Sequence, residues 1–201
     1  TLLLGTSYHP GGLRLSRRLL DAIELKVGER LVDVASGLGT TSMLAAAEYG
    51  AIVDGVDLSA SNVGLATGSA SAAGLADRTH FRHGDAESLP LPDGSSDAVV
   101  CECALCTFPD KETAVAEMVR VLRPGGRIGI SDVTAERHRL PRELTGLGAW
   151  VACVADARPS AEYEALFTAH GLRVTHVEQH PEAVSRMLRQ IAARVELLRM
   201  T

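Results

Sequence analysis

Short apolar runs and amphipathic segments alternate along this chain of 201 residues. Aliphatic and β-branched residues dominate six stretches that we predict to be strands, at about 30–35, 51–57, 79–84, 97–103, 126–131 and 172–178. Helices are predicted between them at 40–49, 60–73 and 110–122. Because strands that alternate with helices form parallel sheets covered on both faces, the pattern predicts an α/β fold, a three-layer sandwich around a mostly parallel sheet.

The segments outside this alternation are predicted to be mostly helical. An amphipathic helix that includes Leu13, Leu20 and Ile23 precedes the first strand, and we expect it to cover the carboxyl edge of the sheet. After the fifth strand, helices are predicted at 143–156, 160–169 and 182–199.

Composition narrows the class of protein without changing the fold. The net charge of −5 and the aromatic share of 3% argue against a basic, stacking surface for nucleic acid. No apolar run reaches the roughly 20 residues that cross a membrane, and the first residues lack the features of a secretory signal. We therefore expect a cytoplasmic protein, and because no Met precedes Thr1, a sequence that starts within a longer chain.

Small residues and acids gather where the predicted strands end. A turn of small residues follows the first strand, from Ala35 to Gly39, and the next helix begins directly after it. Asp57 ends the second strand, where a carboxylate can accept both hydroxyls of a ribose, and Asp85 ends the third. Right-handed crossovers bring the carboxyl ends of parallel strands to one edge, so we expect a shared ligand site there.

This pattern is compatible with two kinds of nucleoside ligand, a dinucleotide and S-adenosylmethionine. A dinucleotide fingerprint that starts at Gly37 needs a third glycine at position 42, which is Ser42, so that match fails. The pattern acid-x-small-x-Gly-x-Gly is met by Asp33, Ala35, Gly37 and Gly39 and is typical of S-adenosylmethionine sites. A simpler alternative stays open, in which the acids lie at loop edges and the glycines only close turns.

On these residues the chain resembles the class I S-adenosylmethionine-dependent methyltransferases. The resemblance covers about residues 5–180 and includes the stretch 119–126 that leads into the fifth strand. It implies a Rossmann-like fold, S-adenosyl-L-methionine as cofactor and a small-molecule methyl acceptor, and it leaves the oligomeric state open. Such folds end in an antiparallel strand, for which no residues remain after the helix predicted at 182–199.

The resemblance also implies roles for particular residues. Asp57 holds the ribose, Asp85 and Ala86 flank the adenine, and the turn at 35–37 faces the methionine part, although Ala35 stands where the family usually has glycine. The residues implied in cofactor binding are Asp33, Ala35, Ser36, Gly37, Gly39, Thr40, Asp57, Leu58, Asn62, Asp85, Ala86 and Cys101.

We expect a single methyltransferase domain over residues 1–201. Its expected parts are a cap helix and loop at 1–28, a cofactor-binding core at 29–133, and the acceptor side at 134–201 with the sixth strand and the terminal helix.

Three of the four cysteines lie close together on and after the fourth strand: Cys101, Cys103 and Cys106. The two-residue period of a strand predicts that Cys101 and Cys103 share one face and that Glu102 takes the other. Structural zinc favours two C-x-x-C knuckles, and only one loose motif with a distant Cys153 is present, so we predict no metal site. Cysteines are also small hydrophobes that fill buried strands, and this alternative stays open.

Within the methyltransferases the chain is most similar to the arsenite methyltransferase group. That group has a cysteine shortly before a Pro-Asp-Lys helix start, matched by Cys103, and a second in the following helical region, matched by Cys153. The resemblance implies that these thiols, with Cys106 as a third candidate, hold a trivalent metalloid, because soft centres prefer thiolate ligands.

Two further side chains are candidates for acid–base or binding roles. His9 lies in the glycine loop, where shaping the loop is the simpler role, and Glu102 is equally suited to bind the ammonium of the cofactor. The sequence thus predicts methyl transfer to a small acceptor such as arsenite. The alternatives are an O-, N- or C-methyltransferase with structural cysteines, and a non-catalytic nucleoside-binding or metal-sensing protein.

Overall fold

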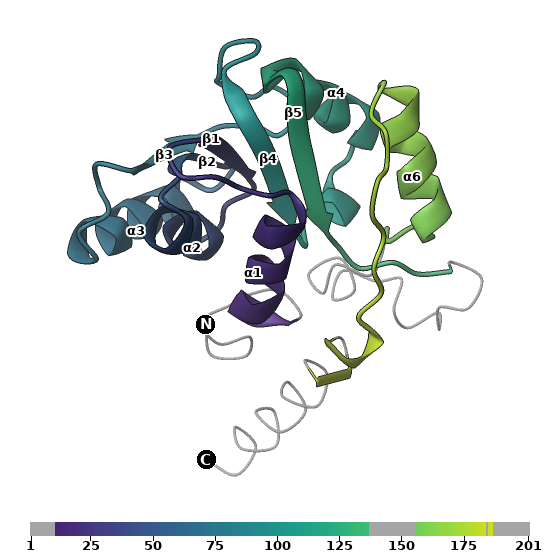
Figure 1. The fold of residues 1–201 in the computed structure, drawn as a ribbon, viewed down its shortest axis with the longest axis horizontal. Helices are drawn as coiled ribbons and strands as arrows, with labels where there is room; N and C mark the ends of the chain where they lie inside the picture. The colour runs from purple at the N-terminus through teal and green to yellow at the C-terminus, as the bar shows by residue number, and fades with distance from the viewer. Residues whose placement is uncertain (1–10, 137–155, 184, 187–201) are drawn as a thin grey trace.

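The fold is built on five parallel strands in the computed structural model, which describes residues 11–136, 156–183 and 185–186. The strands are β1 (Arg30–Val34), β2 (Ile52–Asp57), β3 (Thr79–His83), β4 (Ser96–Glu102) and β5 (Leu122–Ser131). Their order across the sheet is β3-β2-β1-β4-β5 (Figure 1). The chain thus adds β2 and β3 on one side of β1, and then β4 and β5 on the other side, with all strands parallel. The predicted α/β fold with a parallel sheet is confirmed.

Helices cover both faces of this sheet. One layer contains α1 (Gly12–Ala22), α2 (Thr40–Tyr49) and α3 (Ala60–Ala72), and the opposite layer contains α4 (Lys111–Val121) and α6 (Ser160–Ala169) (Figure 1). A short 3-10 helix, η1 (Leu105–Thr107), connects β4 to α4. The three-layer arrangement is therefore confirmed as well.

The alternation of side chains along each strand explains the two layers. In β1, Leu31 packs in a buried cluster with side chains of α1 and α2, whereas Val32 and Val34 pack in a second cluster with side chains of α4 and α6. Both sets are apolar because both faces of a parallel sheet are buried. The two cores hold the sheet rigid, so the loops at its carboxyl edge start from fixed positions.

The predicted sixth strand is wrong. Residues 172–178 form no strand, and all of them except Leu172 are exposed, with Val174 and Val177 at 37% and 51% exposure. Apolar residues do alternate along this segment, but its residues form no sheet pairing. Glu178 at its end forms an ion pair with Arg18 of α1 at 2.6 Å. Among the described residues β5 is thus an edge strand, like β3.

One other difference concerns the start of a strand. β5 begins at Leu122, earlier than predicted, because Leu122 pairs with Ser96 ahead of an irregularity in the β4–β5 register. The predicted helix at 160–169 is confirmed as α6. The helices predicted at 143–156 and 182–199 lie almost wholly outside the described residues, and the domain boundaries stay predictions.

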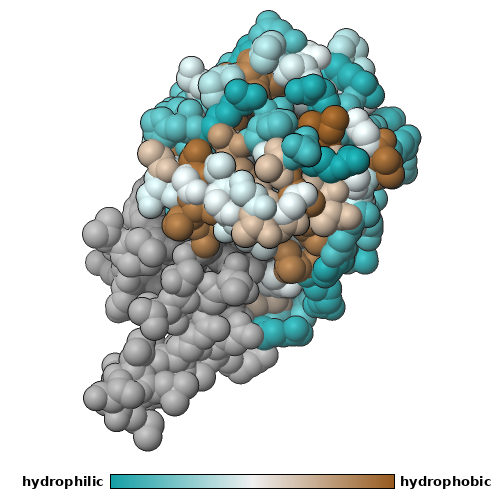
Figure 2. Space-filling model, turned by 90° about the vertical axis from the view of Figure 1, so that its left-hand side faces the viewer, coloured by the Kyte–Doolittle hydropathy of each residue, from teal (hydrophilic) through white to brown (hydrophobic). Residues whose placement is uncertain are grey.

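The outer surface near α3 is mixed in character. Leu58 and Leu65 are 69% and 58% exposed. On the face shown in Figure 2, hydrophobic residues lie in separate patches between polar and small ones. Among the described residues, no helix combines the length and the apolar character that a membrane crossing requires.

A buried ion pair ties the start of α4 to the segment before α6. The Lys111 side chain is 1% exposed, and its Nζ donates to Asp156 Oδ2 at 2.5 Å and to the Phe108 carbonyl at 2.9 Å. Because an ammonium group removed from water needs such partners, this pair fixes how α6 and the residues before it meet the β4 loop.

We predict that Lys111→Ala lowers the free energy of unfolding by about 3 kcal/mol, because the ion pair between the buried ammonium and Asp156 would be lost. Urea unfolding followed by circular dichroism measures this change. Arg17→Ala is the matched control, since it removes an exposed pair with Glu48 and should change stability little. Equal effects of the two substitutions would contradict the prediction.

Candidate functional site

The carboxyl ends of β1, β2 and β4 meet around one tight turn, residues 35–39. Three residues in it have left-handed backbone: Ala35 (φ 58°), Gly37 (φ 55°) and Gly39 (φ 73°). For Ala35 this conformation costs about 1–2 kcal/mol, which glycine would avoid. The turn directs the first N–H groups of α2 toward the space above the strand ends, as in sites that bind anions.

Asp57 fixes this turn to the neighbouring strand. Its Oδ2 accepts from the Gly37 N–H at 2.8 Å, and its Oδ1 accepts from the Ser59 N–H at 2.9 Å and from Asn62 Nδ2 at 3.1 Å. Each carboxylate oxygen has two acceptor positions, so Oδ2 retains capacity for a ligand hydroxyl. The Gly84 N–H donates to the Asp57 carbonyl at 3.1 Å, which brings the turn with Asp85 beside it.

Glu102 is held over the turn from the other side. Its Oε1 accepts from Thr41 Oγ1 at 2.7 Å, and its Oε2 accepts from Ser16 Oγ at 3.2 Å. Ser16 is fully buried on α1, so the cap helix contacts the site directly. Sequence reasoning identified Glu102 but missed Ser16 and Thr41, because small hydroxyl residues on helices give no signal until the helices are placed.

Asp33 is the most deeply buried acid of the group. Burial raises the pKa of Asp33 from its ordinary value of 3.8 to about 7, against the opposing effect of the hydrogen bond from Ser42 Oγ at 2.6 Å. The nearby charge of Glu102 raises this pKa further. A carboxyl group that loses its proton near neutral pH is typical of functional sites.

Asp33, Thr41 and Glu102 line a common cavity of about 140 Å³ at the strand ends, and Asp57 lies outside its lining. Its walls come from the turn, the start of α2 and the end of β4: Asp33, Ala35, Ser36, Leu38, Thr40, Thr41, Glu102, Cys103 and Ala104. The enclosed volume suits an amino-acid-sized group. Exposed residues Leu58 and Asp85 lie beyond it, next to Asp57, so a nucleoside would lie along an open surface there.

The cysteines occupy three different environments. Cys101 is fully buried among apolar side chains of β1 and α4, and burial raises the pKa of its thiol well above the usual range. Cys103 lines the cavity because the chain leaves the strand there, with φ 54° and its N–H donating to the Ser131 carbonyl at 2.7 Å. The even alternation that predicted a shared face for Cys101 and Cys103 ends at Glu102.

Cys106 lies behind the cavity wall. It is 1% exposed on η1, its N–H donates to Asp132 Oδ2 at 3.0 Å, and it belongs to an apolar cluster against which Cys103 packs. Cys153 and His9 lie outside the described residues. Among the residues that are described, no group of three potential metal ligands was found.

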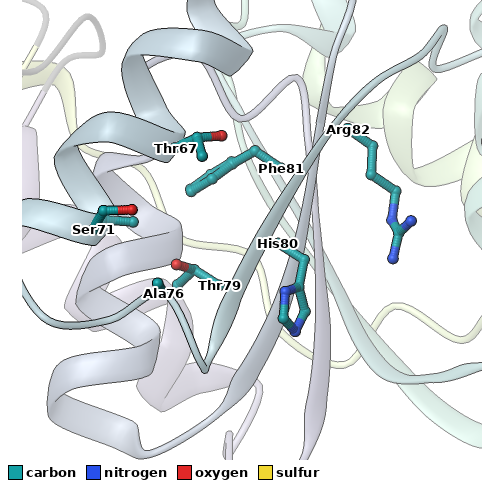
Figure 3. Close-up of a pocket in the computed structure, with 8 residues that line it drawn as sticks. Thr67, Ser71, Ala76, Thr79, His80, Phe81 and Arg82 are labelled. Atoms are coloured by element: carbon teal, nitrogen blue, oxygen red, sulfur yellow. The ribbon is translucent and has the colours of Figure 1, made fainter.

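A larger hollow of about 350 Å³ lies away from the strand ends, between α3 and the outer edge of β3 (Figure 3). Thr67, Ser71 and Thr79 contribute to its lining. The acids of the strand ends are not part of it, so the chemistry of the site points to the smaller cavity.

Residues 32–130 match the family of methyltransferase domains. The core of this chain is a methyltransferase domain. The match extends from within β1 to the end region of β5 and includes Asp33, Asp57, Asp85 and Glu102. This match confirms the resemblance to methyltransferases that the sequence indicated.

Similar proteins place this methyltransferase domain among enzymes of varied reactions. The chain is 34% identical over 122 residues to the methyltransferase GfsG of Streptomyces halstedii and 32% identical over 164 residues to an arsenite methyltransferase of Halobacterium salinarum. These alignments cover 61% and 78% of this chain but 44% and 40% of the relatives, so the chain spans less than half of their length.

A solved structure with a different reaction has the same fold. The [4+2]-cyclase SpnF superposes with a TM-score of 0.81 at 27% identity, covering 92% of this chain and 65% of the cyclase. The methyltransferase domain is therefore a scaffold for more than one chemistry, and the function has to be argued from the site.

We predict that Asp33 makes the protein less stable as pH rises. The folded state keeps the Asp33 proton up to about pH 7, whereas the unfolded chain releases it near its ordinary value of 3.8. Between these values the folded form binds more protons, so this group lowers stability by about 1.4 kcal/mol per pH unit, and the loss levels off above pH 7.

Urea unfolding of the wild type and of Asp33→Asn at about pH 5 and about pH 8 measures this dependence. The substitution should gain stability relative to the wild type at the higher pH. A constant difference between the two proteins would show that Asp33 is ionised throughout.

Proposed function

We propose that this protein transfers a methyl group from S-adenosyl-L-methionine to a small-molecule acceptor. The observation that carries the proposal is the convergence of Asp33, Asp57 and Glu102 on the left-handed turn at 35–39. Two carboxylates at successive strand ends and a glycine turn at a helix start suit a nucleoside linked to an amino acid.

Residues of the cavity and of the open surface beside it would bind different parts of the cofactor. Asp57 would accept the ribose hydroxyls, and Leu58 and Asp85 with Ala86 would flank the adenine. Glu102, oriented by Thr41 and Ser16, would bind the ammonium of the methionine part.

The enzyme's own task is to position and to exclude water. When bound, S-adenosyl-L-methionine supplies an electrophilic methyl group on a sulfonium. Cys103 and Ala104 form the cavity wall beside Glu102, so an acceptor would approach from that side. Holding donor and acceptor in line removes much of the entropic barrier without a metal or a general base.

For the acceptor we propose a trivalent metalloid such as arsenite, bound by Cys103 and Cys153. Cys103 lines the cavity, and an arsenite methyltransferase is among the similar proteins. Thiolates are the preferred ligands of such soft centres, and two of them would fix the lone pair toward the methyl group. Cys106 is a third candidate because it belongs to the cluster on which Cys103 packs.

A specific observation favours a second candidate, an O-, N- or C-methyltransferase of a metabolite. Cys101 and Cys106 are 0% and 1% exposed in apolar clusters, as expected of cysteines that only pack. In that case Cys103 would shape the pocket and take no part in binding a metalloid.

Calorimetry with S-adenosylhomocysteine tests the cofactor site. We predict that Asp57→Ala raises the dissociation constant about 10- to 100-fold, because a charge-assisted hydrogen bond to the ribose is lost. Asp77→Ala is the control, since it removes the same charge at the amino end of β3. If the wild type binds neither S-adenosylhomocysteine nor S-adenosylmethionine, the proposed function is wrong.

Assay of methylated arsenic products tests the acceptor. We predict that Cys103→Ser and Cys153→Ser each reduce turnover to background while leaving the affinity for S-adenosylhomocysteine unchanged, because serine oxygen is a poor ligand for a soft centre. Cys101→Ser is the control for a thiol that only packs. Unchanged turnover in both variants rejects thiol capture and favours the second candidate.

A further inference from the structure

Phe81 of β3 lies beside the turn at residues 35–39, the cofactor turn, although it is not among the residues assigned to the site. It is the register partner of Gly55 on β2, and its side chain points to the α3 side of the sheet (Figure 3). His80 and Arg82, its neighbours on the strand, point to the other side. Phe81 therefore packs into the layer that carries the turn and α2.

Two glycines leave the space that this ring fills. A Cβ atom built on Gly55 would lie 2.6 Å from Phe81 Cδ1, and one built on Gly39 would lie 2.7 Å from Phe81 Cε1. Real Cβ atoms do not approach other atoms so closely, because packed interiors leave no such overlap. One edge of the ring thus runs from β2 to the last residue of the turn.

Ser36 of the turn borders the same space. The Cβ position of Gly55 that faces Phe81 lies 3.0 Å from Ser36 Oγ. This hydroxyl is buried and has no hydrogen-bond partner among the described residues, so no polar contact of its side chain holds Ser36 in place. The turn therefore borders the apolar ring at Gly39, and the hydrogen bond from Gly37 to Asp57 ties it to β2.

The outer side of Phe81 is open. The ring lines the hollow between α3 and β3, whose other walls include Thr67, Ser71 and Thr79 (Figure 3). Because this hollow lies directly behind the ring, a smaller side chain at position 81 would leave the turn without support from below.

We infer that Phe81 is a positioning residue that sets the place of the cofactor turn by filling the space left by Gly39 and Gly55. This inference rests on the proposed cofactor site. It explains why position 55, inside a strand where glycine is unfavourable, has no side chain.

The test uses size exchange between positions 81 and 55 in the full chain, with calorimetry of S-adenosylhomocysteine. Phe81→Ala is expected to raise the dissociation constant about tenfold, because the turn shifts by a fraction of an ångström. Gly55→Ala alone should do the same, since the ring is pushed toward Gly39. Combining Gly55→Ala with Phe81→Leu should restore affinity to within about threefold of the wild type, because the two size changes offset each other.

His80→Ala on the opposite face of the strand is the matched control and should leave affinity unchanged. Amide hydrogen exchange of residues 35–41 gives a readout without ligand: it should speed up in Phe81→Ala, stay unchanged in His80→Ala and return toward the wild type in the double variant.

The inference is overturned if a folded Phe81→Ala protein keeps both its affinity and its exchange rates, or if the effects of Gly55→Ala and Phe81→Leu simply add. If Phe81→Ala does not fold, the double variant decides. Should the wild type not bind S-adenosylhomocysteine, the proposed function fails, and exchange in the turn still decides whether Phe81 supports it.

Discussion

The hydrogen bond from the Gly37 N–H to the Asp57 carboxylate is the contact on which the site depends. It joins the turn after β1 to the end of β2. These two strands are neighbours in a sheet whose two faces are buried beneath helices. A carboxylate that accepts from two backbone N–H groups is held in one orientation. The position of Asp57 relative to the turn therefore follows from the sheet register and does not need a ligand.

Around this contact the described part of the chain places two carboxyl groups on uncharged hydrogen-bond donors. Asp33 and Asp57 accept from neutral donors, namely the Ser42 hydroxyl, two backbone N–H groups and the Asn62 amide. Burial leaves Asp33 protonated below about pH 7. Once Asp33 loses its proton, the site suits a cationic ligand, which is the charge character of a sulfonium and an ammonium.

The backbone conformation at Cys103 places two cysteines of one motif in different environments. Cys101, inside β4, is a core residue with a raised pKa, whereas Cys103, two positions later, lines the cavity. The difference comes from the left-handed conformation at Cys103, which ends the alternation of the strand. A non-glycine residue in that conformation is strained, and such strain is commonly found at functional sites.

The sequence by itself determined the sheet, the helices on both faces and the acids at the strand ends, because hydrophobic period, glycine turns and strand-end position are local properties. It did not determine that residues 172–178 stay outside the sheet. Their alternation of apolar and polar residues is that of a strand, and it does not show whether a neighbouring strand pairs with them. Only the tertiary structure brought Ser16 to Glu102 and Phe81 to Gly39, because these contacts join residues 86 and 42 positions apart and depend on how layers pack. Only packing, likewise, separated one thiol on the cavity from two in the core.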